Sequence, residues 1–207
     1  REKTEVGSRG WSYPPGSLYV RNIAPDKTRA LVTELGLGGE EATRANERAL
    51  GGKLMRLRAP RVGLYQPWTS SMDEGWTRWL LEQFRFPYTS VMDAEIKKGG
   101  LNEKYDIVIL PDDTAARITG ERPTERGAAG PRPDDTYPPE YRSGIGNEGV
   151  KSLKAFVESG GTLVALGGAS NFAIEKFELR VRNVVLNRSS KEFWCPGSTL
   201  RMKFDNA

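Results

Sequence analysis

The chain has 207 residues, a formal net charge of +4, a single cysteine and no histidine. This length suits one domain of about 150 residues with an appendage, or two small domains. Without histidine, the chain cannot form a Ser-His-Asp or Cys-His triad or a histidine-containing zinc site. The lone Cys195 excludes an internal disulfide and a CxxC cluster. Most hydrolytic chemistry is therefore excluded within these residues.

The basic excess lies at the start of the chain, where residues 1–61 have a charge balance of +5 against −1 for the rest. Its densest part is Lys53, Arg56, Arg58 and Arg61. Such a cluster suits either nucleic acid or a solvated or interdomain face, and the lack of a motif or aromatic platform favours the second. No run approaches the roughly 20 apolar residues of a membrane span. We therefore expect neither a nucleic-acid nor a membrane partner.

Residues 1–59 read as a linker followed by a small αβ segment. Residues 1–17 are polar and rich in Gly and Pro, which is typical of an irregular arm. Residues 18–23 are a strand candidate, an amphipathic helix is expected from Pro25 to the stop at Gly36, and residues 40–50 are a further helix candidate. Arg1 follows no initiator Met or signal peptide, so we expect a piece of a longer chain.

From residue 60 to 207, strands and helices alternate regularly. The expected strands are 61–65, 88–92, 106–110 and 162–166, with later candidates at 181–186 and 199–204. The expected helices are 73–84, 93–98, one capped by Asn147 with Val150, Leu153, Phe156 and Val157 facing inward, and 171–177. Residues 112–146 read as a long excursion with little periodicity. This rhythm predicts an α/β fold with a doubly wound, mostly parallel sheet.

The helix expected at 73–84 carries two local signals. Ser71 and Glu74 form a capping-box pattern, in which each side chain reaches the other residue's backbone N–H. An aromatic and aliphatic face follows at helical spacing and is expected to be mostly core: Trp76, Trp79, Leu80 and Phe84. Stacking on carbohydrate or peptide is the alternative for Trp68, if it lies at the mouth of the sheet.

Ligands of doubly wound sheets bind beyond the carboxyl ends of the strands. The candidate site residues in those segments are Gln66, Trp68, Asp73, Glu74, Asp112, Asp113, Gly167, Gly168, Ser170 and Asn171. Asp73, Glu74, Asp112 and Asp113 suit a divalent cation or an acid/base pair, or simply helix capping, which we favour, and no metal is assigned. Ser170 lies where α/β enzymes raise a nucleophile, but an N-cap role for Ser170 or Asn171 is the simpler interpretation.

The segment GIGNEG at residues 144–149 matches the dinucleotide fingerprint G-x-G-x-x-G. That fingerprint requires a strand directly before it, whereas PPEYRS precedes it here and cannot form a central strand. Glu140 and Glu148 would also repel a phosphate. We therefore interpret the motif as a loop and the start of a helix.

Four strings carry a resemblance to a known family: RVGLYQPWTSSMDEGWTRWLLEQFRFPYTSV, DIVILPD, PPEYRSGIGNEGVKSLKAFVESGGTLVAL and CPGSTL. They resemble the C-terminal domain of bacterial secreted zinc carboxypeptidase-like proteins. In that family the domain is class I glutamine amidotransferase-like, with a flavodoxin-like fold, and follows the peptidase domain. The resemblance covers most of residues 60–205, and residues 1–59 look like the family's connecting segment.

The resemblance implies a secreted or periplasmic parent that acts in proteolysis and holds zinc in an upstream peptidase domain. Amidotransferases of this class use a Cys in a G-x-C-x-G elbow with a later His and Glu, whereas this chain has ALGGAS and no His. We therefore expect no catalytic residue and no cofactor here, but an accessory or pseudoenzyme domain. Its expected partners are the upstream peptidase domain, a peptide or cell-wall ligand, or a second copy. The alternative is an unconventional hydrolase using Ser170 or the Asp73, Glu74, Asp112 and Asp113 carboxylates.

Overall fold

The computed structural model describes residues 4–6, 11–13, 17–42, 47–48, 54, 56–121 and 136–195. The chain divides into two compact units, Arg1–Ala59 and Pro60–Ala207. The candidate site residues all lie in the second unit.

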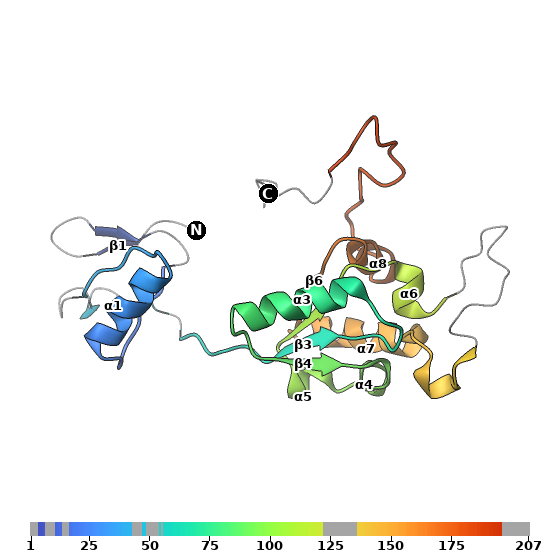
Figure 1. The fold of residues 1–207 in the computed structure, drawn as a ribbon, viewed down its shortest axis with the longest axis horizontal. Coiled ribbons are helices and arrows are strands. Elements are labelled where there is room, and N and C mark those ends of the chain that lie inside the picture. The colour runs from blue at the N-terminus through green and yellow to red at the C-terminus, as the bar shows by residue number, and fades with distance from the viewer. Residues whose placement is uncertain are drawn as a thin grey trace. The chain divides into compact units, whose positions relative to one another are not determined.

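The described part of the first unit includes a short antiparallel ribbon and the helix α1 (Figure 1). Strands β1 (Thr4–Val6) and β2 (Trp11–Tyr13) pair with Glu5 opposite Ser12. Helix α1 (Pro25–Glu34) begins at a proline, whose fixed φ suits the first helical position. Gly36 follows it at a φ of +61°, as the predicted stop requires. No residue of α1 is buried.

Two expectations for this unit have different outcomes. The strand predicted at residues 18–23 is wrong: this segment is irregular, and Asn22 turns the chain with a φ of +60°. A left-handed residue interrupts the extended backbone that a strand needs. Of the helix predicted at 40–50, residues 40–42 are irregular and 47–48 are helical, while the others lie outside the described residues.

The second unit is an α/β fold built on a four-stranded, all-parallel sheet. Its strands are β3 (Val62–Tyr65), β4 (Tyr88–Val91), β5 (Ile107–Leu110) and β6 (Thr162–Ala165). The spatial order is β4-β3-β5-β6, so the second strand of this unit lies beside the first and the chain then reverses direction across the sheet. This is a flavodoxin-like doubly wound order, with its switch point between β3 and β5.

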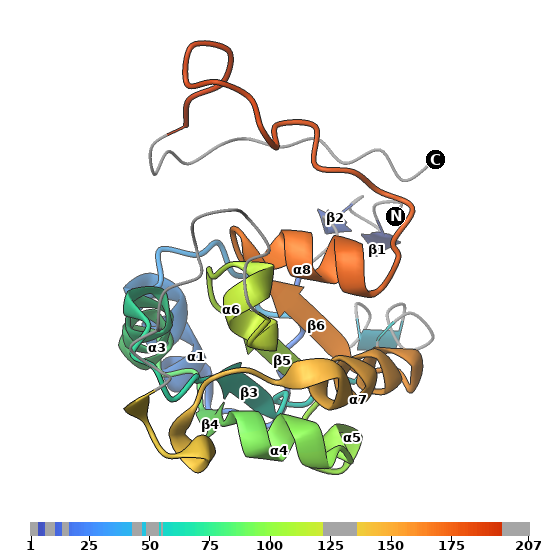
Figure 2. The ribbon, with the colours of Figure 1, turned by 90° about the vertical axis from the view of Figure 1, so that its right-hand side faces the viewer.

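Helices lie on both faces of the sheet (Figure 2). One face carries α4 (Asp93–Lys98), α5 (Leu101–Lys104) and α7 (Gly146–Glu158), and the other carries α3 (Met72–Gln83). Helices α6 (Ala115–Thr119) and α8 (Ala169–Lys176) pack against each other. The sequence did not predict α5 or α6, because each is only one turn or slightly more and shows no repeating period.

The hydrophobic core includes the sheet face under α4 and α7. Val91, Val108, Leu110, Leu153 and Phe156 are each 1% exposed or less. Side chains alternate along a strand, so Leu64 and Tyr65 point to opposite faces. On the α3 side, Leu64 is buried, but Ile107 and Ile109 are only half-buried. Strand β5 is therefore fully buried on one face of the sheet and only partly buried on the other.

Two predictions for α7 are wrong in detail. The helix begins at Gly146 with Ile145 at its N-cap, so Asn147 lies within the first turn rather than capping it. Leu153 and Phe156 face the core as expected, whereas Val157 is 37% exposed.

The strand predicted at 181–186 does not form. Asn183 Oδ1 accepts hydrogen bonds from the backbone N–H groups of Val185 and Leu186, both at 3.1 Å. This local turn occupies amides that a ladder would need. The strand predicted at 199–204 lies outside the described residues.

Candidate functional site at the carboxyl edge of the sheet

The four strands of the sheet run in the same direction, so their carboxyl ends meet at one edge, and the candidate residues lie in the segments that follow them. Most of these residues bond to a neighbouring backbone group or side chain rather than meeting in a single cluster. Among the described residues, no group of three or more His, Cys, Asp or Glu side chains is placed to hold a metal ion.

Asp112 and the Gly167–Gly168 turn, both among the candidate residues, lie in contact at this edge. Asp112 Oδ1 accepts a hydrogen bond of 2.7 Å from the Gly168 N–H at the start of α8. Gly167 has a φ of +50°, and a Cβ there would collide with the Asp112 carboxylate. The Asp112 carboxylate therefore occupies the space beside the Gly167–Gly168 turn, which a substrate would need if this turn were catalytic. It also stabilises the amino end of α8.

Ser170 and Asn171 lie inside α8, so the prediction that either is its N-cap is wrong. The helix starts at Ala169, with Gly168 in a helical conformation before it. Ser170 Oγ donates to the Ala165 carbonyl at 3.2 Å, and Asn171 Oδ1 accepts from Asn183 Nδ2 at 3.0 Å. The hydroxyl is thus bonded back to the end of β6, and no base contacts it in the described part of the chain.

Asp113 acts at the start of the next helix. Its Oδ1 accepts from the Thr114 N–H at 2.7 Å and lies 3.6 Å from Arg117 Nε. Thr114 in turn caps α6 by accepting from the Arg117 N–H. Both carboxylates after β5 therefore have capping and pairing roles, the simpler of the two interpretations.

Asp73 and Glu74 lie in the first turn of α3. Ser71 accepts from the Glu74 N–H at 3.3 Å, which confirms half of the predicted capping box. The reciprocal half is absent: Glu74 Oε1 is buried without a hydrogen-bond partner, and Oε2 lies 3.8 Å from an Arg78 nitrogen. Burial raises the pKa of the Glu74 carboxyl above its usual range, and the Arg78 charge opposes this shift. Asp73 is exposed.

A buried network at the ends of β3 and β4 was missed by sequence reasoning. Tyr65, the last residue of β3, donates from its hydroxyl to Asp93 Oδ1 at 2.7 Å, and the Gly144 N–H donates to the same oxygen at 3.2 Å. Asp93 is 3% exposed, and its Oδ2 has no partner. Burial and then the Asp93 charge raise the pKa of the Tyr65 hydroxyl. An Asp that opens a helix directly after a strand was the available signal.

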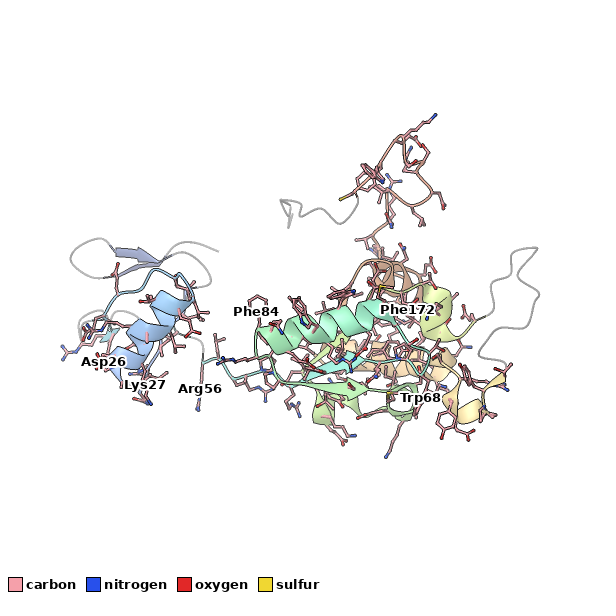
Figure 3. All side chains as sticks on the ribbon, viewed as in Figure 1. Asp26, Lys27, Arg56, Trp68, Phe84 and Phe172 are labelled. Atoms are coloured by element: carbon pink, nitrogen blue, oxygen red, sulfur yellow. The ribbon has the colours of Figure 1, made fainter. Side chains whose placement is uncertain are left out.

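Trp68 lies at this edge, on the loop that follows β3 (Figure 3). The loop is anchored because the Gln66 N–H donates to the Val91 carbonyl at 3.0 Å. Trp68 packs edge-on against Tyr141 at 4.9 Å between ring centroids, and Ser143 Oγ accepts from the Thr69 N–H at 2.6 Å. Trp68 is 45% exposed, so part of its ring faces solvent.

The expectation that the aromatic face of α3 is core is wrong. Trp76, Trp79, Leu80 and Phe84 are 60%, 50%, 49% and 69% exposed. Glu74 is the only buried residue of this helix. Helical spacing placed these side chains on one face correctly, but it cannot tell which face turns to the sheet.

The GIGNEG segment forms the end of the loop before α7 and the first turn of that helix, and it follows a 3-10 turn at Pro139–Tyr141, so no strand leads into it. The N–H of its first glycine, Gly144, already bonds to the Asp93 carboxylate. A negative side chain thus takes the amide that a phosphate would need, in agreement with the loop interpretation.

Of the basic cluster, Arg61 has an internal partner: its guanidinium pairs with Asp106 at 3.0 Å and bonds to the Asn102 carbonyl. Lys53 lies outside the described residues.

In the described ranges, no helix is long and apolar enough to cross a bilayer.

Comparisons with known proteins found no matching family model, no matching curated protein and no matching solved structure.

Proposed function

We propose that this chain is a non-catalytic accessory domain, which binds or supports a zinc carboxypeptidase-like domain of the same protein. The carrying observation is the turn after β6, where the Asp112 carboxylate is bonded to the Gly168 N–H at 2.7 Å and Ser170 is bonded to the Ala165 carbonyl. An enzyme that used this turn would need an open backbone and a hydroxyl beside a base.

The neighbouring groups support the same proposal. Asp113 is committed to Thr114 and Arg117, and Asp93 to Tyr65 and Gly144. Such carboxylates stabilise loops and helix starts, which suits a scaffold that presents a surface. The assignment to a carboxypeptidase-like protein rests only on the sequence resemblance over most of residues 60–205.

The surface that we assign to binding is the Trp68 and Tyr141 pair. Both rings are nearly half-exposed, at 45% and 46%, and loop contacts on either side hold them in place. A rigid, partly exposed aromatic pair gives contact area at small entropic cost and suits the side chains or sugar rings of peptide or cell-wall ligands.

Calorimetric titration of the 207-residue chain tests the binding part. The probes are the zinc peptidase domain encoded by the same gene, short peptides and cell-wall fragments. We expect one of them to bind, and Trp68→Ala to weaken that binding at least tenfold. Trp194→Ala is the matched control, because Trp194 is also exposed, at 75%. Absence of binding to all three probes would contradict the proposal.

The gene tests the family part separately. A zinc carboxypeptidase-like parent requires an H-x-x-E motif with a later His upstream of Arg1. If these ligands are missing, the assignment to a carboxypeptidase-like parent is wrong. The binding role of Trp68 is tested independently by the titration.

The alternative is an unconventional hydrolase. Buried Glu74, with its raised pKa, has the character of a general acid. Its ion-pair partner is Arg78 of the same helix. A hydrolase would also need a nucleophile, and Ser170 is bonded to the Ala165 carbonyl instead. Turnover assays with ester, amide and glycoside substrates separate this alternative from the proposal.

A further inference from the structure

The Trp68 and Tyr141 rings form a corner rather than a flat stack. Their planes are almost perpendicular, at 85°, and their centroids are 4.9 Å apart. The two rings come from segments far apart in sequence, the loop after β3 and the 3-10 turn Pro139–Tyr141. Figure 3 shows Trp68 beside that turn. Nearly half of each side chain is exposed, so parts of both rings are open to a ligand.

Hydrogen bonds hold this corner in place. Ser143 Oγ accepts from the Thr69 N–H at 2.6 Å and donates to Thr69 Oγ1 at 2.9 Å, which joins the two segments beside the rings. The next residue, Gly144, donates its N–H to the buried Asp93 carboxylate. The corner is therefore formed before any ligand arrives, which lowers the entropic cost of binding.

Aromatic ring faces select for positive charge. The face of an indole or phenol ring is electron-rich, so a cation within about 6 Å of the ring centre is attracted to it, most strongly at tryptophan. Lysine and arginine side chains also carry an aliphatic stem that covers apolar surface while the charged group stays near water. Trp68 and Tyr141 together offer both kinds of contact.

The charges around the corner favour the same sign. The two segments that carry the rings, with the first turn of α3, contain three carboxylates and one guanidinium: Asp73, Glu74 and Glu140, and Arg142. Glu74 lies 3.8 Å from Arg78, which offsets its charge, whereas Asp73 and Glu140 are exposed. The Arg142 Nε donates to the Tyr137 carbonyl at 2.9 Å.

Asp93 adds a buried carboxylate beside these segments. It is 3% exposed, and its Oδ2 has no hydrogen-bond partner. A buried charge acts through a medium of low dielectric constant, so its field is weakened less than that of a surface charge. The local balance is therefore negative, which favours a cationic ligand over a neutral or anionic one of the same size.

We infer that the Trp68–Tyr141 corner binds the side chain of a lysine or arginine in a peptide, with the charged group against the ring faces. The inference rests on the proposed binding role of this pair. It adds the charge of the ligand, which separates a basic peptide from a neutral sugar ring.

Nuclear magnetic resonance titration of the isotope-labelled 207-residue chain tests the charge preference. The probes are capped pentapeptides with glycine at every position except the centre, which is lysine, norleucine or glutamate. Norleucine keeps the aliphatic stem of lysine without its charge. We expect the lysine peptide to bind about fivefold more tightly than the norleucine peptide, and the glutamate peptide to bind most weakly.

Equal affinity for the lysine and norleucine peptides would overturn the inference and leave the accessory role intact. Binding of the peptidase domain or of cell-wall fragments, with none of the three peptides bound, would have the same meaning. If no probe of either kind binds, both the inference and the proposed function are wrong. These comparisons use the unchanged chain, so they do not depend on the folding of a variant.

Two variants locate the preference. Trp68→Leu keeps apolar surface without a ring, so the affinity ratio of the lysine and norleucine peptides should fall close to one, whereas the control Trp194→Leu should keep it. Glu140→Gln should weaken binding of the lysine peptide about twofold and leave the norleucine peptide unchanged. Glu158→Gln is its control, because Glu158 is exposed at the far end of α7. A ratio that survives Trp68→Leu would place charge recognition elsewhere and overturn the inference.

Discussion

The hydroxyl of Tyr65 donates a hydrogen bond of 2.7 Å to the carboxylate of Asp93, and both residues are almost completely buried. This bond joins the carboxyl end of β3 to the first turn of α4. The same carboxylate oxygen accepts from the Gly144 N–H, which brings the loop before α7 to the same point. Three segments that are distant in sequence therefore meet at one buried acceptor beside the switch point of the sheet.

We expect Tyr65→Phe to destabilise the second unit by about 1–3 kcal/mol, because it removes a donor from a buried carboxylate whose other oxygen already has no partner. Urea denaturation measures the change. Tyr88→Phe is the matched control: Tyr88 donates to Glu82 Oε1 at 2.7 Å in an exposed pair. Tyr88→Phe should change the free energy of unfolding much less. Equal changes in the two variants would show that burial of the Tyr65–Asp93 bond does not increase its contribution to stability.

Asp112→Ala should lower the free energy of unfolding by about 1 kcal/mol, since it removes the acceptor for the Gly168 N–H at the start of α8. Asp112→Asn keeps an acceptor oxygen and should recover part of the loss. Chemical denaturation of both variants checks the order. If the Ala variant is as stable as the original chain, the turn does not depend on this carboxylate.

Glu74→Gln should leave the protein at least as stable at pH 7. Burial raises the pKa of Glu74 in the folded state, so the folded chain holds the proton more tightly than the unfolded chain. As the pH rises from the ordinary glutamate value through the raised one, the unfolded chain releases this proton first, and stability falls.

Below the ordinary pKa of glutamate, Glu74 is protonated in both states and this cost disappears. The original chain should therefore gain on the Gln variant as the pH is lowered from 7 to 4. Thermal unfolding at several pH values measures the difference. A variant that is clearly less stable at pH 7 would mean that the Arg78 contact outweighs the cost of burial.

Gly63 and Gly75 should respond in opposite directions to alanine. A Cβ at Gly63 would lie 2.8 Å from Val91 Cγ2 and 3.1 Å from Tyr105 Cδ1, so Gly63→Ala should destabilise by about 1–3 kcal/mol. Gly75 lies in α3 with nothing within 4 Å of such a Cβ, so Gly75→Ala should stabilise by up to about 1 kcal/mol. Denaturation of both variants decides, and a tolerated Gly63→Ala would contradict the close packing of β3.

The α/β fold was predictable because its strands are short apolar runs separated by amphipathic helices. The strands at 61–65, 88–92, 106–110 and 162–166 appear within one residue of the expected bounds at each end. The order of the strands in space was not specified by those runs. It depends on packing between residues far apart in the sequence, such as Tyr105 against Gly63.

The direction of side chains was harder to predict than their grouping. Spacing put Trp76 and Trp79 on one face of α3, but the choice between sheet and solvent depends on what the sheet offers beneath the helix. The rule that strand ends meet at one edge put Asp112 and Gly168 among the same candidate residues, but it did not specify the bond between them. The Tyr65–Asp93–Gly144 network was not predictable from that rule, because Gly144 lies in the segment 112–146, which has little hydrophobic periodicity.

Turnover by the 207-residue chain is the most direct test of a non-catalytic accessory domain. Ester, amide and glycoside substrates are each offered to the original chain and to a variant that combines Glu74→Gln, Asp112→Asn and Ser170→Ala. We predict that both proteins give the rate of buffer alone on every substrate. A rate above buffer that the triple variant loses would contradict the account and would assign catalysis to these side chains.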